Sequence, residues 1–247
     1  MWGKEMDAIK TIGLTKQYKD TLAVDNLDLT VAEGELFSLL GVNGAGKTTT
    51  IKMLSCLTTP TKGDAYLLGK SIKTDSLAVK PMIAVSPQET AIAGGLSVQE
   101  NLKLMCGIHG LDKATGESRI SELTQLLGLD TILKKKAGKL SGGWQRRLSI
   151  AMALISQPKI LFLDEPTLGL DVLSRSDLWD IIRSLKSKAT IILTTHYMEE
   201  AEALSDRVAI MKDGKLLICD SVENIKSVAQ ADRFEEAFIR IVKEAKK

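Results

Sequence analysis

A glycine-rich stretch near residue 41 has the residue types and spacing of a loop that binds phosphate groups. Its sequence, Gly41-Val42-Asn43-Gly44-Ala45-Gly46-Lys47-Thr48, fits the pattern G-x-x-x-x-G-K-[ST]. The apolar run Leu36–Leu40 before it has the length of a buried strand, and a helix is predicted after it over residues 49–57. This order favours a nucleoside triphosphate site over a glycine-rich turn without a ligand, although kinases, GTPases and motor proteins would all share it.

The residue types of this loop explain how it would hold phosphates. Gly41, Gly44 and Gly46 allow backbone angles that other residues disfavour, and they let the chain come close to a phosphate. The amides of the loop would then point into one concavity at the positive end of the helix dipole. Lys47 can reach the outer phosphates, and Thr48 offers a hydroxyl to Mg²⁺, which prefers oxygen ligands.

A second pair of glycines occurs further along the chain, in the stretch Leu140-Ser141-Gly142-Gly143-Trp144. An apolar helical stripe follows it and ends before Pro158. Ser141 is the natural N-cap of that helix, which is a purely structural role. The two glycines after it expose bare amides at the positive end of the helix, so this stretch is also a candidate for a second anion site.

Two strand ends carry side chains that suit metal and water chemistry. Asp164 and Glu165 follow an apolar strand predicted over residues 160–163. Asp164 can hold the hydration shell of Mg²⁺, and Glu165 can orient and deprotonate a water molecule; a helix-capping acidic pair is the alternative. His196 follows a buried strand predicted over residues 190–194, and its place near the expected phosphates favours a functional role over a structural one.

Tyr18 and Gln88 are candidate site residues, but the sequence also fits a purely structural role for each. Tyr18 lies between two short predicted strands, where it could be a half-buried tyrosine at a strand end or could stack on a purine. Gln88 comes just after a strand predicted over residues 83–85, and in such folds sites gather at strand ends. It offers a neutral oxygen ligand, but it could equally be an exposed glutamine.

The composition is that of a soluble globular protein, with 247 residues, 44% hydrophobic and 26% charged. A net charge of +2 and only 4% aromatic residues argue against a nucleic-acid partner and against an anionic membrane surface. The three cysteines form no C-x-x-C pair, so neither a zinc site nor a disulfide framework is expected. The first ten residues lack a signal-peptide core, and no run of about 18 apolar residues occurs. The chain is therefore expected in the cytoplasm and is not expected to cross a membrane by itself.

The remaining patterns predict the elements around these motifs. Ser97 and Glu100 form a capping box at the start of a helical region over about residues 90–157. Asp213 and Gly214 predict a hairpin turn between strands at residues 208–211 and 216–218. Further strands are predicted at residues 9–12, 27–31 and 65–68, the last at a sheet edge, and an amphipathic helix is predicted over residues 232–247.

The phosphate loop, the stretch LSGGW-Q, the stretch ILFLDE and His196 occur in this order, and with them the chain resembles the ATP-binding subunit of an ABC transporter. The resemblance covers nearly the whole chain. It is specific, because the second glycine motif occurs together with the phosphate loop essentially only in that family. It implies an α/β fold with a phosphate-loop NTPase core, an antiparallel β subdomain and a helical subdomain. The implied single ABC ATPase domain comprises a core at 1–87 and 158–220, a helical subdomain at about 88–157 and a C-terminal helical extension at 221–247.

The resemblance also implies a role for each motif residue. Ser141, Gly142 and Gly143 match the family's signature motif, which contacts the ATP held by a second copy. The family usually has glutamine where this chain has Trp144, but activity is expected to survive because the serine and the glycines make the phosphate contact. The other implied roles are adenine stacking for Tyr18, nucleotide binding for residues 41–48 and Thr49, metal contacts for Thr48, Gln88 and Asp164, the catalytic base for Glu165, a γ-phosphate contact for His196 and a place in the dimer-interface loop for Asp171.

ATP and Mg²⁺ are the cofactors that the resemblance implies. It also implies a head-to-tail dimer with a second ATPase subunit and a separately encoded integral membrane permease, at the cytoplasmic face of the membrane. The opening LTKQYKD and the ending RFEEAFIRI resemble exporter subunits of the two-component drug-resistance type. An importer subunit is the near alternative. An ABC protein that acts on ribosomes or DNA is the alternative from another class, against which the single cassette and the balanced charge argue.

Overall fold

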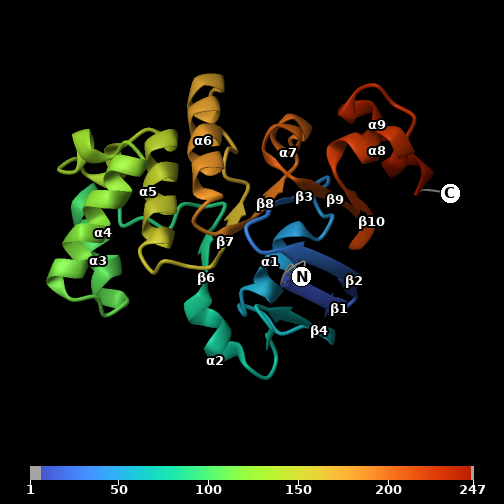
Figure 1. The fold of residues 1–247 in the computed structure, drawn as a ribbon, viewed down its shortest axis with the longest axis horizontal. Helices are drawn as coiled ribbons and strands as arrows, with labels where there is room; N and C mark the ends of the chain where they lie inside the picture. The colour runs from blue at the N-terminus through green and yellow to red at the C-terminus, as the bar shows by residue number, and fades with distance from the viewer. Residues whose placement is uncertain (1–6, 246–247) are drawn as a thin grey trace, which may run out of the picture.

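The computed structural model describes residues 7–245, and a six-stranded sheet forms its centre (Figure 1). The spatial order is β10-β9-β3-β8-β7-β6, in which β10 is antiparallel to β9 and the other neighbours are parallel. The carboxyl ends of the parallel strands therefore meet at one edge of the sheet. The strands are β3 (Leu36–Leu40), β6 (Ile83–Ser86), β7 (Ile160–Asp164), β8 (Thr190–Thr195), β9 (Arg207–Lys212) and β10 (Lys215–Asp220).

Both faces of this central sheet are covered, which explains why its inner strands are continuous apolar runs. In β7, Ile160 and Phe162 pack into one hydrophobic cluster, while Leu161 and Leu163 pack into another. This alternation follows from the two-residue repeat of a strand. The buried strands predicted from the sequence around residues 36–40, 160–163 and 190–194 are confirmed.

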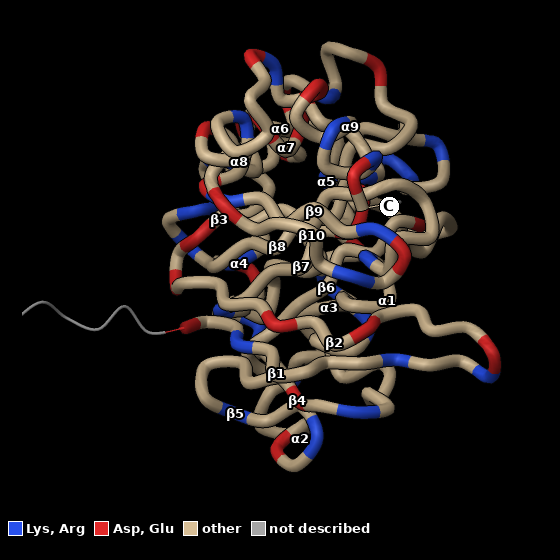
Figure 2. Tube along the Cα trace, turned by 90° about the vertical axis from the view of Figure 1, so that its right-hand side faces the viewer, with Lys and Arg blue, Asp and Glu red and all other residues tan. Residues whose placement is uncertain are grey.

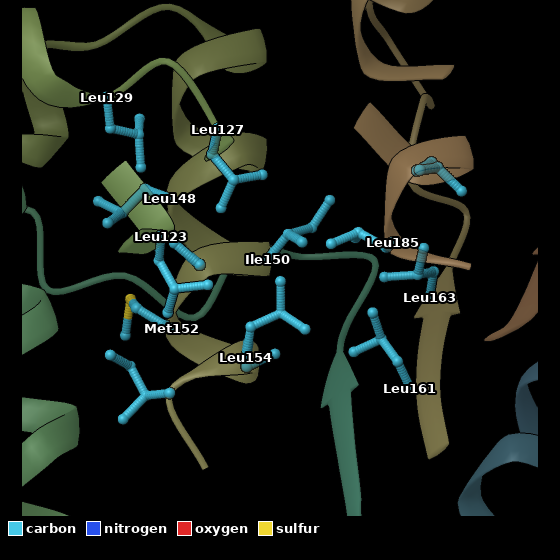
Figure 3. Packing of buried hydrophobic residues seen from close by; sticks show 14 of the residues in the cluster. Leu123, Leu127, Leu129, Leu148, Ile150, Met152, Leu154, Leu161, Leu163 and Leu185 are labelled. Carbon is cyan, nitrogen blue, oxygen red and sulfur yellow. The ribbon is translucent and has the colours of Figure 1, made fainter. Parts of the chain in front are cut away.

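Helices α3 to α5 lie together at one end of the molecule (Figure 1). Figure 3 shows side chains of α5, such as Ile150, between those of α4 and those of β7. The predicted capping box is confirmed, because the Ser97 hydroxyl accepts from the Glu100 amide at 3.2 Å and the Glu100 carboxylate accepts from the Ser97 amide at 2.7 Å. The helices are α1 (Lys47–Leu54), α2 (Ser76–Val79), α3 (Val98–Ile108), α4 (Lys113–Leu126), α5 (Gly142–Leu154), α6 (Val172–Leu185), α7 (Met198–Leu204), α8 (Val222–Val228) and α9 (Phe234–Glu244).

A second sheet, of order β2-β1-β4-β5, is antiparallel and lies below the central sheet in Figures 1 and 2. The strands predicted at residues 9–12 and 27–31 are longer than expected. Irregular pairing near Gly13 and Asn26, which both have positive φ, breaks the alternating pattern without ending the strands. The predicted edge position of residues 65–68 is wrong, because β4 pairs with β1 on one side and β5 on the other. The strands are β1 (Asp7–Tyr18), β2 (Thr21–Ala32), β4 (Lys62–Leu67) and β5 (Lys70–Ser71).

Several helix assignments differ from the sequence prediction. Helix α1 starts at Lys47 rather than at residue 49, and it ends at Leu54 because Cys56 has a positive φ of 57°. Helix α9 covers part of the range predicted as 232–247, of which residues 246–247 lie outside the described residues. Helices α2, α6 and α7 were not predicted, whereas α8 lies within the C-terminal helical extension that the resemblance implies at 221–247. The expected absence of a signal-peptide core concerns the first ten residues, and residues 1–6 also lie outside the described part.

The predicted hairpin turn at Asp213 and Gly214 is confirmed, with β9 and β10 antiparallel on either side of it. Both turn residues have positive φ, 49° and 79°. The Gly214 amide donates to the Ala45 carbonyl at 3.2 Å, and the Gly214 carbonyl accepts from the Asp25 amide at 2.9 Å. The turn therefore rests directly on the phosphate loop.

Charged residues of both signs are interspersed along the chain in the view of Figure 2. Between residues 7 and 245, no helix is both long and apolar enough to cross a bilayer.

Candidate active site

The chain segments that follow β3, β6, β7 and β8 line one cavity of about 790 Å³. Residues 43–49 of the phosphate loop and of the start of α1 line it, together with Gln88, Glu165 and His196. Residues 21–23 of β2, Leu168 and Asp213 of the hairpin turn complete the lining. The structure thus brings together residues that are far apart in the sequence, because four parallel strands end at the same edge of the sheet.

The glycines of the phosphate loop serve different purposes. Gly44 and Gly46 have positive φ, 82° and 100°, as predicted for a tight loop. A Cβ on Gly46 would also lie 2.5 Å from the Ala23 carbonyl. Gly41 does not have a positive φ, and a Cβ there would lie 2.4 Å from the Met211 carbonyl. Glycine at position 41 is therefore required by the approach of β9, rather than by an unusual backbone angle.

Lys47, the first residue of α1, is buried at the base of the cavity with 5% of its surface exposed. Its ammonium group donates to the Gly41 carbonyl at 2.7 Å and to the Val42 carbonyl at 3.3 Å. Its nitrogen also lies 3.6 Å from the Glu165 carboxylate. Burial lowers the pKa of Lys47, and the negative charges of Glu165 and Asp164 partly oppose this shift.

Glu165 follows β7 directly, and its carboxylate is shared between two neighbours. One oxygen lies near Lys47, and the other lies 2.5 Å from Nδ1 of His196. The Glu165 amide donates to the carbonyl and the hydroxyl of Thr194, at 3.1 and 3.0 Å. Its φ of 47° is in the left-handed region, which costs a residue with a Cβ about 1–2 kcal/mol. Backbone strain at a residue held by several contacts is typical of functional positions.

The predicted metal residues offer a set of oxygen donors that fits Mg²⁺. The Thr48 hydroxyl donates to the Asp164 carboxylate at 3.3 Å, so the two side chains converge at the cavity base. Gln88 is exposed and lines the same cavity. In the described part of the chain, no three or more His, Cys, Asp or Glu side chains cluster as a metal site. Mg²⁺ typically takes one or two protein oxygens and completes its shell with water and substrate phosphates, which agrees with this sparse set.

The signature stretch, residues 140–144, does not line this cavity. Ser141 is the N-cap residue of α5, as predicted, but its hydroxyl makes no capping hydrogen bond. Ser141 and Gly142 are both exposed. The exposed amide end of α5 is therefore available for an anion that comes from outside this chain.

Asp171 is also exposed, and it caps the neighbouring helix α6. Its carboxylate accepts from the Ser174 amide at 3.0 Å and from the Ser174 hydroxyl at 2.7 Å. These hydrogen bonds lower the pKa of Asp171. Like the signature stretch, Asp171 does not line the cavity, so a role at a dimer interface stays a prediction.

Tyr18 does not line the cavity either, although its strand partner Thr21 does. Tyr18 is 42% exposed, and the ammonium nitrogen of Lys16 lies 4.9 Å from the centroid of its ring. Adenine stacking by Tyr18 therefore stays a prediction. Residues 21–23, Leu168 and Asp213, which do line the cavity, were not predicted as site residues.

Trp144 is half-buried and contacts its own helix. The Arg147 guanidinium lies 4.9 Å from the Trp144 ring, and it also forms an ion pair with Asp177 at 2.9 Å. These contacts hold the indole within its own chain.

Two buried charged residues beside the site were also missed by the sequence interpretation. Arg146 of α5 is 4% exposed, and Glu200 of α7 is fully buried. One Glu200 oxygen accepts from the Thr167 hydroxyl at 2.8 Å and from the Trp179 indole at 3.2 Å. The signal in the sequence was a charged residue on the same helical face as apolar ones, such as Glu200 beside Ala201 and Leu204.

A parallel sheet with a phosphate loop, a buried acidic pair and a histidine at its carboxyl edge defines a phosphate-loop nucleoside triphosphatase. A family model described as "ABC transporter" matches residues 24–168, which is more than half of the chain. The chain belongs to the ABC transporter family as one of its ATPase domains. A shorter model, described as "AAA domain, putative AbiEii toxin, Type IV TA system", matches residues 136–201 within the same fold.

Three similar proteins cover most of this chain. The daunorubicin/doxorubicin resistance ATP-binding protein DrrA of Streptomyces peucetius is 41% identical over 89% of the chain and 67% of its own length. The probable multidrug ABC transporter ATP-binding protein YbhF of Escherichia coli is 37% identical over 93% of the chain. The human phospholipid-transporting ATPase ABCA3 is 42% identical over 82% of the chain. The chain spans only 40% of the length of YbhF and 12% of that of ABCA3.

Solved structures agree with the family assignment. A structure of an ATP-binding subunit of an ABC transporter superposes with a TM-score of 0.84 at 26% identity, and it covers 95% of this chain and 99% of that chain. A dimeric, post-hydrolysis structure of the ATP-binding cassette MJ0796, bound to ADP and Pi, gives a TM-score of 0.77 at 27% identity. It covers 86% of this chain and 98% of that chain. The predicted ABC ATPase fold is thereby confirmed.

Proposed function

We propose that this chain hydrolyses ATP in composite sites formed by two ATPase subunits in head-to-tail pairing, and that it drives export through a separate membrane permease. One observation carries the composite site: the exposed amides after Ser141 lie outside the cavity that contains Lys47. A second subunit can supply such amides to the ATP held by the first. The opposite exchange completes the other site, which gives a closed twofold arrangement. The dimeric MJ0796 cassette supports this pairing by similarity.

In this proposal each residue of the cavity has a defined task. The amides of residues 43–49 and the Lys47 ammonium bind the phosphates. Glu165 orients the attacking water and accepts its proton, while His196 contacts the γ-phosphate and hydrogen-bonds the Glu165 carboxylate. Thr48, Gln88 and Asp164 hold Mg²⁺, which supplies charge neutralisation on the phosphates when it is bound.

The ion pair between Lys47 and Glu165 implies that ATP binds before Glu165 acts as the base. While Lys47 faces Glu165, its ammonium group occupies one oxygen of the carboxylate. Phosphate oxygens that reach Lys47 compete for its charge. ATP binding thus releases Glu165 for its role as the base.

Export is supported by the relatives, of which DrrA is named for drug resistance and YbhF for multidrug transport. In this proposal the partner is a separately encoded integral membrane permease, and the chain is peripheral at the cytoplasmic face of the membrane. The same proposal divides the chain into a core at 1–87 and 158–220, a helical subdomain at about 88–157 and a C-terminal extension at 221–247. Import remains the alternative direction.

The test is to purify the tagged chain from membranes and to identify the protein that accompanies it. A protein with several membrane spans is the expected partner. The complex is then placed in vesicles with the ATPase subunits outside, and ATP-dependent movement of a daunorubicin-like drug into the lumen is measured. Uptake that requires ATP supports export, whereas purification with ribosomes or DNA would contradict the transport function.

A further inference from the structure

Arg146, on the first turns of α5, is enclosed by protein although its side chain is charged. Only 4% of its surface is exposed. Its guanidinium donates to the Pro87 and Gln88 carbonyls, each at 2.6 Å, and to the Glu165 carbonyl at 3.5 Å. A buried charge of this kind is tolerated only when hydrogen bonds replace those of water. The three carbonyls therefore account for its position in the protein interior.

These carbonyls belong to two different strand ends. Pro87 and Gln88 come directly after β6, and Glu165 comes directly after β7. The guanidinium has five donors in a planar fork, so it can bond several carbonyls at once, which a lysine ammonium does less well. Burial lowers the pKa of Arg146, while the nearby charge of Asp164 favours its charged form.

We infer that Arg146 is a positioning residue that fixes the main chain of Gln88 and Glu165 relative to the signature helix α5. It does so through the carbonyls and not through the reacting side chains. The inference rests on the proposed function, in which Gln88 holds the metal and Glu165 is the base. Removing the guanidinium takes the side-chain donor from the Pro87 and Gln88 carbonyls, while the Glu165 carbonyl keeps the Leu168 amide at 3.2 Å, so the two segments lose a shared anchor.

The effect on kinetics follows from what Arg146 does and does not touch. Lys47 and the amides of the phosphate loop, which bind ATP, have no hydrogen bond to Arg146. Arg146→Met keeps much of the apolar side-chain volume and removes every donor. We expect it to lower kcat by at least tenfold and to leave the KM for ATP within about twofold of that of the wild type. Arg146→Lys retains the charge and some donors, so its kcat is expected to be intermediate.

Ser149 offers a matched control, because it forms a second buried contact between α5 and β6. Its hydroxyl lies 3.0 Å from that of Ser86, and Ser149 lies three residues after Arg146 on the same side of the helix. Ser149→Ala removes a contact between the same two elements without touching the carbonyls of residues 87, 88 and 165. Its kcat is expected to stay within about twofold of that of the wild type.

Amide hydrogen exchange provides a measurement that does not depend on hydrolysis. Peptides that contain residues 86–90 and 164–168 should exchange faster in Arg146→Met than in the wild type and in Ser149→Ala, while peptides of β3 and α1 should be unchanged. Unchanged exchange in both segments would overturn the inference, even if the wild type hydrolyses no ATP. An equal loss of kcat in Ser149→Ala would also overturn it, since general packing would then explain the effect. Absence of hydrolysis by the wild type, with the exchange result as expected, would contradict the proposed function alone.

Discussion

The Lys47 ammonium and the Glu165 carboxylate lie 3.6 Å apart, and both side chains are more than nine-tenths buried. The lysine starts the helix after β3, and the glutamate follows β7, two strands away in the central sheet. The group proposed to bind phosphate and the group proposed to activate water are thus each other's counter-ion. This relationship leads to separate expectations for the two residues.

Glu165→Gln should separate ATP binding from hydrolysis. The amide keeps the size of the side chain but cannot accept a proton from water, so turnover should fall by roughly 10²–10⁴-fold. ATP should still bind, and the ATP-bound dimer should accumulate because it is not cleaved. Phosphate release and size-exclusion chromatography with ATP measure the two effects. Turnover at the wild-type rate would rule out Glu165 as the base.

Lys47→Ala should abolish ATP binding at concentrations that saturate the wild type, because the phosphates lose their one buried cation in the cavity lining. Calorimetry with ATP and Mg²⁺ measures this directly. Lys52→Ala is the matched control, since Lys52 lies on the same helix and is exposed. Equal affinity of Lys47→Ala and the wild type would mean that the loop is a structural turn.

The composite site predicts that two inactive variants restore activity when they are mixed. Lys47→Ala removes the phosphate cation, and Ser141→Arg blocks the exposed end of α5. In a mixed dimer, one of the two sites contains both an intact Lys47 and an intact Ser141. ATPase activity of the mixture should therefore exceed that of either variant alone, and the specific activity of the wild type should rise with protein concentration. This test assumes that one intact site is enough for activity. If the variants form mixed dimers but the mixture stays inactive, a second subunit does not complete the site.

Trp144→Gln should change ATPase activity by only a small factor. The indole packs against Arg147 in its own chain, so its loss removes a contact of about 0.5–1 kcal/mol from stability rather than a contact with ATP. Steady-state kinetics and thermal unfolding measure the two quantities. A loss of activity of tenfold or more, about 1.4 kcal/mol of barrier, would assign the indole a specific role.

Glu200→Gln should alter how stability depends on pH. Burial raises the pKa of Glu200 above its ordinary value of 4.5, although the hydrogen bonds from Thr167 and Trp179 oppose the shift. The folded state therefore binds a proton that the unfolded state has released. The contribution of Glu200 to the free energy of unfolding is fully present below pH 4.5. It is lost as the pH rises through the raised pKa of the folded state.

Urea unfolding from pH 4.5 upward tests this sign for Glu200. The wild type should lose more stability with rising pH than Glu200→Gln, whose side chain carries no charge. Glu35, whose pKa burial also raises, contributes equally to both proteins and cancels in the difference. Parallel stability curves would show that Glu200 is charged in the folded state.

The parts of the fold and of the site that could be predicted are those formed by residues that are close together in the sequence. The loop before Lys47, the capping box at Ser97 and the turn at Asp213 each follow from a few consecutive residues. The strands at residues 160–163 and 190–194 were predictable because burial on both faces requires continuous apolar runs.

Other features depend on pairings between distant segments, which no local pattern contains. The Arg146 guanidinium donates to the carbonyl of Pro87, which lies 59 positions earlier in the sequence. The packing of Gly41 against Met211 depends on the pairing of β3 with β9. Ser141 was correctly predicted as an N-cap residue, but only the structure shows that its hydroxyl does not cap the helix.

The hairpin turn behind the phosphate loop has a consequence for the thermodynamics of ATP binding. The Gly214 amide holds the Ala45 carbonyl, and the Ala23 carbonyl lies directly against Gly46. These contacts come from protein segments and do not involve a nucleotide. The backbone entropy of ordering the loop is therefore lost when the chain folds, and ATP binding does not lose it a second time.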